Sequence, residues 1–187
     1  MNVYSSPGGG NGHVPLFDRF VVRSFRPADR LKVFHLHSAA AMGSVPCDCA
    51  AKIDQIEEKY LADPQNHFWV ADAEGEILGT VGICVQNEVA NLHCLRTIDG
   101  SMSHEIRKGL VRVAANHAHQ SGCLKLVLHA QVEDVGRAAE FLHRLGFEFS
   151  RQREVATDPV CEFYLNLYEQ PELPPTGDAV VHARAMH

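Results

Sequence analysis

Two histidines on predicted strands offer the clearest chemistry in this sequence. His93 follows Asn91 by two positions in the strand-like segment 89–97, so both side chains point to one face of a sheet. An unperturbed imidazole titrates near neutral pH, and His93 is therefore a candidate catalytic base with Asn91 beside it. The alternative is a half-buried histidine that bonds a neighbouring carbonyl. His129 closes a later predicted strand, and the same two interpretations apply to it.

Other polar side chains are candidates for substrate binding or for ordinary structural roles. Glu133 and Asp134 follow the strand of His129, where they could bind an amine or form a solvated turn with a helix cap. Tyr164 and Tyr168 lie on the last predicted strand and could line a pocket, although packing is the more common role of such residues.

The spacing of histidines and cysteines does not indicate a metal site. His35 and His37 are two positions apart on a predicted helix, where their rings point to different faces. Cys47 and Cys49 could chelate from a loop, but no second pair of thiols or imidazoles lies near them in the sequence. We therefore expect no bound metal.

The composition is typical of one soluble globular domain. Of 187 residues, 45% are hydrophobic and 21% are charged. The formal net charge of -6 disfavours binding to a nucleic-acid backbone. The longest apolar runs fall short of the roughly 20 residues of a membrane helix, and the polar, glycine-rich N-terminus does not resemble a secretory signal.

The cysteines suggest a reducing compartment. Four of the six lie inside apolar runs, as Cys84 and Cys123 do. A free cysteine behaves as a small buried hydrophobe, and a chain of this length can build its core without disulfides. We therefore expect free thiols and a cytoplasmic protein.

The globular unit is expected between two flexible ends. Residues 1–19 are rich in glycine and proline, and residues 170–187 contain three prolines and lack periodicity. We therefore expect a flexible N-terminal arm and a flexible C-terminal tail around a single domain at residues 20–169.

Hydrophobic periodicity predicts a mixed α/β domain. Strands are expected at 20–25, 67–71, 77–85, 89–97, 124–129, 147–151 and 160–167, and helices at 28–41, 49–61, 103–119 and 135–145. The strand–helix–strand unit across 89–129 requires a parallel crossover, whereas the other strand pairs are hairpins. The sequence predicts a mixed, mostly antiparallel central sheet with one parallel strand pair and helices on both faces.

Apolar residues at helical spacing define the inward faces of these helices. Leu31 and Phe34 are the periodic positions of the first helix, and Ile56 and Tyr60 those of the second. The third helix has an apolar stripe that begins at Ile106.

Three segments resemble the Gcn5-related N-acetyltransferase (GNAT) superfamily. Residues 138–147 resemble its penultimate helix and Leu-Gly-Phe turn, 90–95 its central strand and 76–82 its second hairpin. The resemblance implies the acyl-CoA N-acyltransferase fold and an enzyme that moves an acetyl group from acetyl-CoA to an amine by direct attack. The acceptor would be a small-molecule or peptide amine, and family members often pair through their last strands or tails, which implies a homodimer.

The same resemblance implies where the co-substrate binds. In the family, the pyrophosphate lies at the N-terminus of the helix after the central strand, where free N–H groups and the helix dipole favour anions. Backbone N–H groups near 95–97 would orient the thioester carbonyl. The expected cofactor-binding residues are Leu95, Arg96, Thr97, Met102, Ser103, His104, Glu105, Ile106 and Arg107. Ser101 or Ser103 is expected to cap this helix.

The phosphate-binding loop of this chain is degenerate. Laid on the sequence without gaps, the family motif Arg/Gln-x-x-Gly-x-Gly/Ala meets Met102, Glu105 and Arg107 at its three key positions. A carboxylate at Glu105 would compete with the pyrophosphate for the helix N–H groups. A gapped alignment would make 107–110 the loop, but it would discard the inward position of Ile106.

Further departures from the family pattern fall on Asn91, Val135 and Leu142. They leave an alternative function open, in which the fold is kept as a weak or inactive binding module.

Overall fold

The computed structural model describes residues 19–39, 55–131, 135–155, 158–168 and 179–182. Its strands are β1 (Arg19–Ser24), β2 (His67–Ala73), β3 (Glu76–Gln86), β4 (Val89–Thr97), β5 (Lys125–Gln131), β6 (Glu148–Val155), β7 (Asp158–Asn166) and β8 (Ala179–His182). They form one sheet of eight strands in the order β6-β7-β5-β4-β3-β2-β1-β8. Of the described strand pairs, only β4 and β5 are parallel, which confirms the predicted fold class.

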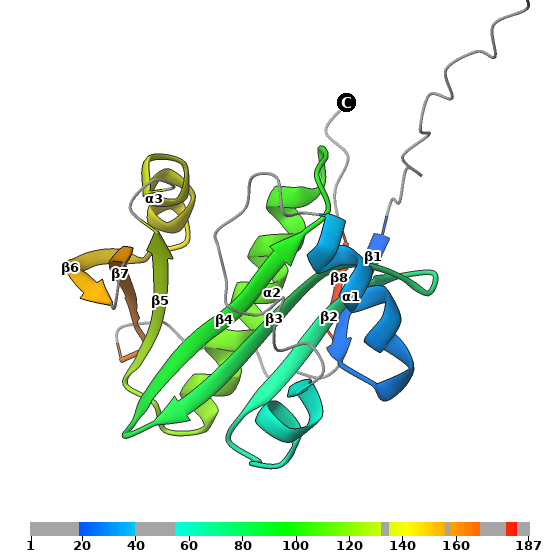
Figure 1. Ribbon diagram of the computed structural model, residues 1–187, viewed down its shortest axis with the longest axis horizontal. Helices are drawn as coiled ribbons and strands as arrows, with labels where there is room; N and C mark the ends of the chain where they lie inside the picture. The colour runs from blue at the N-terminus through cyan, green and yellow to red at the C-terminus, as the bar shows by residue number, and fades with distance from the viewer. Residues whose placement is uncertain (1–18, 40–54, 132–134, 156–157, 169–178, 183–187) are drawn as a thin grey trace, which may run out of the picture.

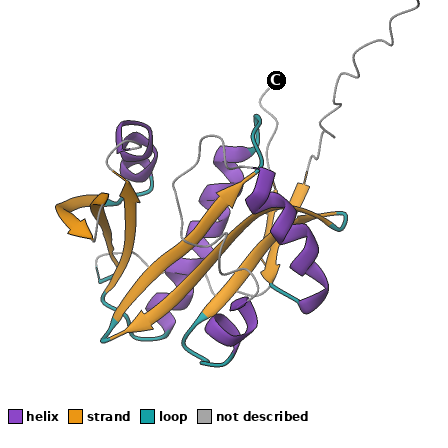
Figure 2. Cartoon of the chain, in the orientation of Figure 1, coloured by secondary structure: helices purple, strands orange, loops and turns teal. Residues whose placement is uncertain are grey.

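Helices cover both faces of this sheet (Figure 2). The short turn η1 (Pro27–Asp29) leads into α1 (Arg30–Ala39), and η3 (Glu57–Leu61) is a second short helix. Both α1 and η3 pack over a smaller buried cluster that includes Phe68 and Tyr60, and we call this side of the sheet the α1 face. The long helix α2 (Ser103–Gln120) and α3 (Val135–Arg144) pack against the larger cluster, and we call that side the α2 face.

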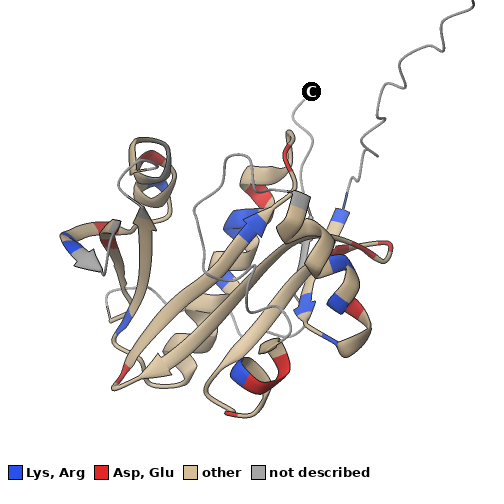
Figure 3. Ribbon diagram, viewed as in Figure 1, with Lys and Arg blue, Asp and Glu red and all other residues tan. Residues whose placement is uncertain are grey.

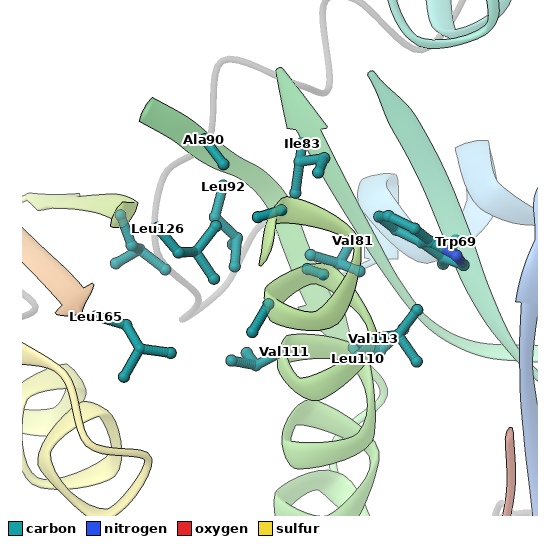
Figure 4. Close-up of a cluster of buried hydrophobic side chains, with 14 of the residues drawn as sticks. Trp69, Val81, Ile83, Ala90, Leu92, Leu110, Val111, Val113, Leu126 and Leu165 are labelled. Carbon is teal, nitrogen blue, oxygen red and sulfur yellow. The ribbon is translucent and has the colours of Figure 1, made fainter. Parts of the chain in front are cut away.

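The larger cluster joins α2 to the middle of the sheet (Figure 4). Trp69, Val81 and Leu92 from the strands meet Leu110 and Val113 from the helix, and all five are buried. Burying such side chains stabilises the fold by about 1.5–3 kcal/mol each.

Gly79 on β3 allows α2 to approach the sheet closely. A Cβ atom at this position would lie 2.9 Å from the carbonyl oxygen of Arg96 and 2.9 Å from a side-chain carbon of Ile106. Since real Cβ contacts are longer, a glycine is required where the helix crosses this strand.

The inward face of α1 differs from the prediction. Leu31 is 67% exposed and Phe34 is 48% exposed, whereas Val33 and Leu36 are buried. The segment offers two apolar stripes at helical spacing, and packing against β3 selects the second. The helix expected at 49–61 is described only from residue 55, where Ile56 and Tyr60 are buried as predicted.

The start of α2 also differs from the prediction. Met102 occupies the N-cap position, and no side-chain hydrogen bond caps the helix. The expectation that Ser101 or Ser103 caps the helix is therefore wrong. The backbone N–H of Ser103 instead donates to the carbonyl of Gly100 (3.2 Å) and closes a turn before the helix.

The C-terminal segment that we expected to be a tail contributes the edge strand β8. Residues 179–182 pair antiparallel with β1, with Val180 opposite Val21. The added strand covers backbone groups of β1 that an edge strand would otherwise expose. The N-terminal arm lies outside the described residues except for Arg19.

Cys84, Cys123 and Cys161 are free and buried, as the sequence predicts. Cys94 is disulfide-bonded, which contradicts the expectation of free thiols at every apolar position. Cys47 and Cys49 lie outside the described residues. None of the described helices has the length and apolar character needed to cross a membrane.

Candidate active site

The parallel strands β4 and β5 separate halfway along their length (Figure 1). Their pairing begins with Val89 opposite Lys125 and ends with Leu92 opposite Leu128. Both strands continue beyond that point, β4 to Thr97 and β5 to Gln131. We call the stretches that are no longer paired with each other, residues 93–97 and 129–131, the splay. Their facing backbone edges offer hydrogen-bonding groups to an extended ligand.

A β-bulge bends β4 at the start of the splay. The register between β3 and β4 shifts between Thr80 and Gly82, and Cys94 has a positive φ of 53°. The hydroxyl of Thr80 donates to the carbonyl oxygen of Cys94 (2.8 Å). His37 Nε2 lies 2.9 Å from the same hydroxyl oxygen. Because the hydroxyl proton is committed to Cys94, His37 donates its Nε2–H to Thr80.

The bulge is braced by two buried polar side chains, His37 and Arg96, for which the sequence suggested other roles. Burial, together with the charge of Arg96, lowers the pKa of His37 from 6.5 to about 4. Arg96 is buried too, and burial lowers the pKa of its guanidinium, which donates to the carbonyl oxygen of His37 (3.4 Å). The imidazole of His37 is therefore neutral at pH 7 and acts as a structural donor.

Asn91 and His93 lie on the same face of β4, as predicted, and this is the α1 face. Asn91 stands opposite Cys84, which belongs to the buried cluster of that face, and His93 stands opposite Gly82. Directly opposed residues share a face of the sheet. Both side chains are half-buried, and His93 is the first residue of the splay on β4.

His129 is the first residue of the splay on β5. Its neighbours Leu128 and Ala130 belong to the buried cluster of the α2 face, so strand alternation turns His129 to the α1 face. The structure therefore brings His93 and His129 to the same face, at the point where their strands part. His129 Nε2 also lies 3.4 Å from a carboxylate oxygen of Glu162 on β7.

The N-terminus of α2 offers backbone donors where the resemblance places a pyrophosphate. The first intrahelical bond runs from the N–H of Ile106 to the carbonyl of Met102 (3.0 Å). The N–H groups of His104 and Glu105 belong to the first turn, which lacks intrahelical acceptors. Glu105 is half-buried in that same turn, and its carboxylate would oppose an anion there.

Arg107 links this helix to both sides of the site. Its Nε–H donates to the hydroxyl of Thr97 at the end of β4 (3.0 Å). Its guanidinium lies 5.6 Å from the centre of the Phe141 ring on α3, and His104 packs edge-on against the same ring at 5.5 Å. Arg107 and His104 thus connect β4, α2 and α3 at the predicted cofactor site.

Four other predicted cofactor residues have side chains that are engaged within the protein. Ile106 is fully buried and its N–H is already used within the helix, so it has no group to offer a cofactor. Leu95 and Met102 pack against the larger cluster, while Arg96 contacts α1.

The backbone of β4 turns donors toward the splay. The N–H of Ile98 donates to Leu78 on β3 (2.9 Å). Because amides alternate in direction along a strand, those of Leu95 and Thr97 point away from β3, toward the unpaired edge. Ser103 is the first residue of α2, and its N–H is used in the turn to Gly100.

The remaining sequence candidates have structural partners or lie elsewhere. Tyr164 donates its hydroxyl to Glu148 (2.6 Å), and Tyr168 is exposed. Glu133 and Asp134 lie outside the described residues. Within the described part of the chain, no three His, Cys, Asp or Glu side chains are grouped to hold a metal ion.

The sequence interpretation missed Glu162 on β7 and its two partners on β6, Arg151 and Arg153. The same carboxylate also contacts His129. Strand alternation could have assigned Glu162 to the face of Tyr164. Nothing in the sequence indicated that β7 lies between β5 and β6.

Comparison with known proteins identifies the family. The model of the acetyltransferase (GNAT) family matches residues 32–147, which is more than half of the chain. The chain belongs to that family, and the resemblance seen in its sequence is confirmed. A comparison with curated protein sequences finds no significant match.

Solved structures share the fold at low sequence identity. A GNAT-family acetyltransferase from Staphylococcus aureus is 17% identical, with a TM-score of 0.66 over 79% of this chain and 99% of the other. The aminoglycoside 6'-N-acetyltransferase from Enterococcus faecium is 15% identical, with a TM-score of 0.62 over 81% and 99%. A mutant spermidine N-acetyltransferase from Vibrio cholerae is 16% identical, with a TM-score of 0.61 over 79% and 95%. These matches confirm the fold and, with the family assignment, an acetyltransferase as the class of enzyme.

Proposed function

We propose that this protein transfers an acetyl group from acetyl-CoA to an amine. The observation that carries the proposal is the end of the β4–β5 pairing at Leu92 and Leu128 in a chain of the GNAT family. An extended thioester arm can add to the edge of β4 there by backbone hydrogen bonds. His93 lies at the same point and can receive a proton.

The described residues fit such a co-substrate, with one unfavourable charge. The amides of His104 and Glu105 and the guanidinium of Arg107 suit a pyrophosphate, whereas the Glu105 carboxylate opposes it. The amides of Leu95 and Thr97 suit the extended arm and the thioester carbonyl.

The proposed reaction is direct attack by the amine nitrogen on the thioester carbonyl. The new C–N bond forms as the C–S bond breaks, and the thiolate leaves with the electron pair of that bond. His93 takes the proton that the amine loses, with Asn91 on the same face beside it. Amides of the splay stabilise the negative charge on the carbonyl oxygen.

An amine is the acceptor class that the named neighbours have in common. Their names specify an aminoglycoside and spermidine, which differ in shape but share amino groups. At 15–16% identity neither particular acceptor carries over. We propose a small-molecule or peptide amine.

Two measurements on the full chain test the proposal. Isothermal titration with acetyl-CoA should show saturable binding, and a thiol-release assay should detect CoA when amines are added. Absence of binding at millimolar acetyl-CoA would overturn the proposal. Binding without thiol release for any amine would favour the second candidate.

That second candidate is a binding module with little transferase activity. It is favoured by the contacts of Arg107 with Thr97 and Phe141 and by the carboxylate of Glu105 in the first turn of α2.

If a pyrophosphate binds this helix, Glu105→Gln should tighten acetyl-CoA binding several-fold, since repulsion at a helix N-terminus is removed. Glu76→Gln, an exposed position at the start of β3, is the control and should leave the affinity unchanged.

A further inference from the structure

A single carboxylate on β7 holds side chains from the two strands beside it. Glu162 Oε1 lies 3.3 Å from Arg151 Nε and accepts from the hydroxyl of Ser150 at 3.1 Å. Its Oε2 lies 3.1 Å from Arg153 Nε and 3.4 Å from His129 Nε2. We call these five residues the Glu162 cluster. A bulge in β6 between Phe149 and Arg151 allows two adjacent side chains, Ser150 and Arg151, to reach the same carboxylate.

The charges of the cluster do not cancel. Two guanidiniums share one carboxylate, so the cluster carries a net positive charge even with His129 neutral. The side chain of Glu162 is 11% exposed, whereas those of Arg151 and Arg153 are 56% and 45% exposed. The carboxylate therefore lies beneath the guanidiniums, which face solvent. Figure 3 shows basic positions on β6 beside an acidic position on the neighbouring ribbon.

The geometry of the contacts leaves donors for a ligand. Each arginine contacts Glu162 through Nε, and its two Nη atoms carry four further N–H donors. A guanidinium fork of this kind matches a carboxylate with two parallel hydrogen bonds. Glu162 thus orients the two guanidinium groups and leaves their Nη donors for a ligand.

The cluster lies at the splay, on the face of the sheet that carries His93. His129, Glu162 and Arg151 are directly opposed across β5, β7 and β6, in the first row after the β4–β5 pairing ends. Helices α2 and α3 fill the other face, so an acceptor must approach the splay from the α1 face. The described helices of the α1 face, α1 and η3, pack on β2, β3 and β4, to one side of the cluster.

Two further charged side chains on these strands, Glu148 and Lys125, are engaged with Tyr164. Glu148 accepts from Tyr164, and the ammonium group of Lys125 lies 5.1 Å from the centre of the Tyr164 ring. Lys125 and Glu148 balance each other in charge, so this pair does not alter the excess of one positive charge within the Glu162 cluster itself.

We propose that the acceptor amine carries a carboxylate, which binds Arg151 and Arg153 while its amino group enters the splay near His93. This inference rests on the proposed transferase function. The guanidiniums lie over β7, and the splay begins beyond β5, so amine and carboxylate are separated by one to two strand spacings, about 5–10 Å. That separation suits a dipeptide or an ω-amino acid better than an α-amino acid. A polyamine would meet repulsion at the same place.

The test compares acceptors that differ only in the carboxylate. Dipeptides and ω-amino acids of increasing length are assayed for acetyl-CoA-dependent thiol release, each beside its carboxamide. We expect carboxylates to have a KM at least about tenfold lower than their amides, the worth of one well-placed ion pair. Equal or better KM values for the amides would overturn the inference and leave the transferase function standing. Absence of both acetyl-CoA binding and thiol release would overturn the function itself.

A double variant assigns the preference to the cluster. Arg151→Gln with Arg153→Gln should raise the KM for carboxylate acceptors about tenfold or more and leave the KM for amides and the kcat unchanged. Arg112→Gln, an exposed position on α2, is the matched control and should change neither. An equal rise in KM for carboxylates and amides would show a structural role and overturn the assignment.

Discussion

The two strands that border the splay are held in place by different interactions. We call them the β4 wall and the β5 wall. The β4 wall is buried, and its bulge is held by the bonds from Thr80 to the Cys94 carbonyl and from His37 to Thr80. The β5 wall, backed by β7 and β6, faces solvent and is held by ion pairs to Glu162. A buried hydrogen-bond network is costly to disturb, whereas ion pairs whose guanidiniums are about half exposed contribute little to stability and remain available to a ligand.

This contrast separates shape from selectivity. The β4 wall determines where the strands part and which amides line the gap, so it must be rigid. The β5 wall carries the charge that an acceptor meets first, so it can change without loss of the fold. Mutations on the two walls should therefore have different effects, and that difference is measurable.

The largest expected effect concerns the histidine of each wall. His93→Gln should lower kcat/KM by about 10²–10⁴-fold, the usual loss when a general base is removed. His129→Gln should lower it by less than about tenfold, because Glu162 already engages its imidazole. Thiol-release kinetics measure both, with acetyl-CoA affinity as the control for folding. A greater loss at His129 would move the base to the β5 wall.

The next effect concerns the stability of the β4 wall in acid. The pKa of His37 is about 4 in the folded state, below its ordinary value of 6.5. The unfolded chain therefore binds more protons between these values, and folding loses stability as pH falls from about 6.5 to 4. The free energy of unfolding falls by on the order of 3 kcal/mol over this range. Urea unfolding across this range should show a flatter pH dependence for His37→Gln.

His35→Gln is the control for that series. His35 lies on the same helix and is exposed, so its variant should follow the pH dependence of the parent chain. If stability depends on pH equally steeply in His37→Gln and in the parent, the inference that His37 is a neutral structural donor is wrong.

A smaller effect is expected where β3 supports the β4 wall. Gly79→Ala should destabilise the fold by about 1–3 kcal/mol, because the new methyl group meets the Arg96 carbonyl and Ile106. Gly136→Ala on α3 has open space around it and should instead stabilise by up to about 1 kcal/mol. Thermal unfolding measures both, and a neutral Gly79→Ala would show that α2 can shift away from the sheet.

The smallest effect belongs to the β5 wall. Glu162→Gln should change the free energy of unfolding by less than about 1 kcal/mol, since its arginine partners are about half exposed. Added salt should weaken stability less in the variant than in the parent, since fewer ion pairs remain to be screened. A loss of several kcal/mol in urea unfolding would mean that both walls are structural.

Local patterns predicted most of the elements because each depends on neighbouring residues. The segment Val89–Thr97 has the bounds expected of it, and Gly146 ends α3 in a turn with a positive φ of 87°. Strand alternation also assigned Asn91 and His93 to one face. The stripe of α1 was mispredicted because Leu31 and Phe34 satisfy the same periodicity as Val33 and Leu36.

By itself, the sequence determined the order of the strands from β1 to β7, the single parallel crossover and the position of His93 on a strand, because periodicity and turn residues act over short distances. Only the tertiary structure decided the point where β4 and β5 separate, the bulge at Cys94 and the meeting of His129 with Glu162, Arg151 and Arg153. These features depend on which strands lie side by side and in what register. Strand order and register arise from packing across the whole sheet, and no local pattern encodes them.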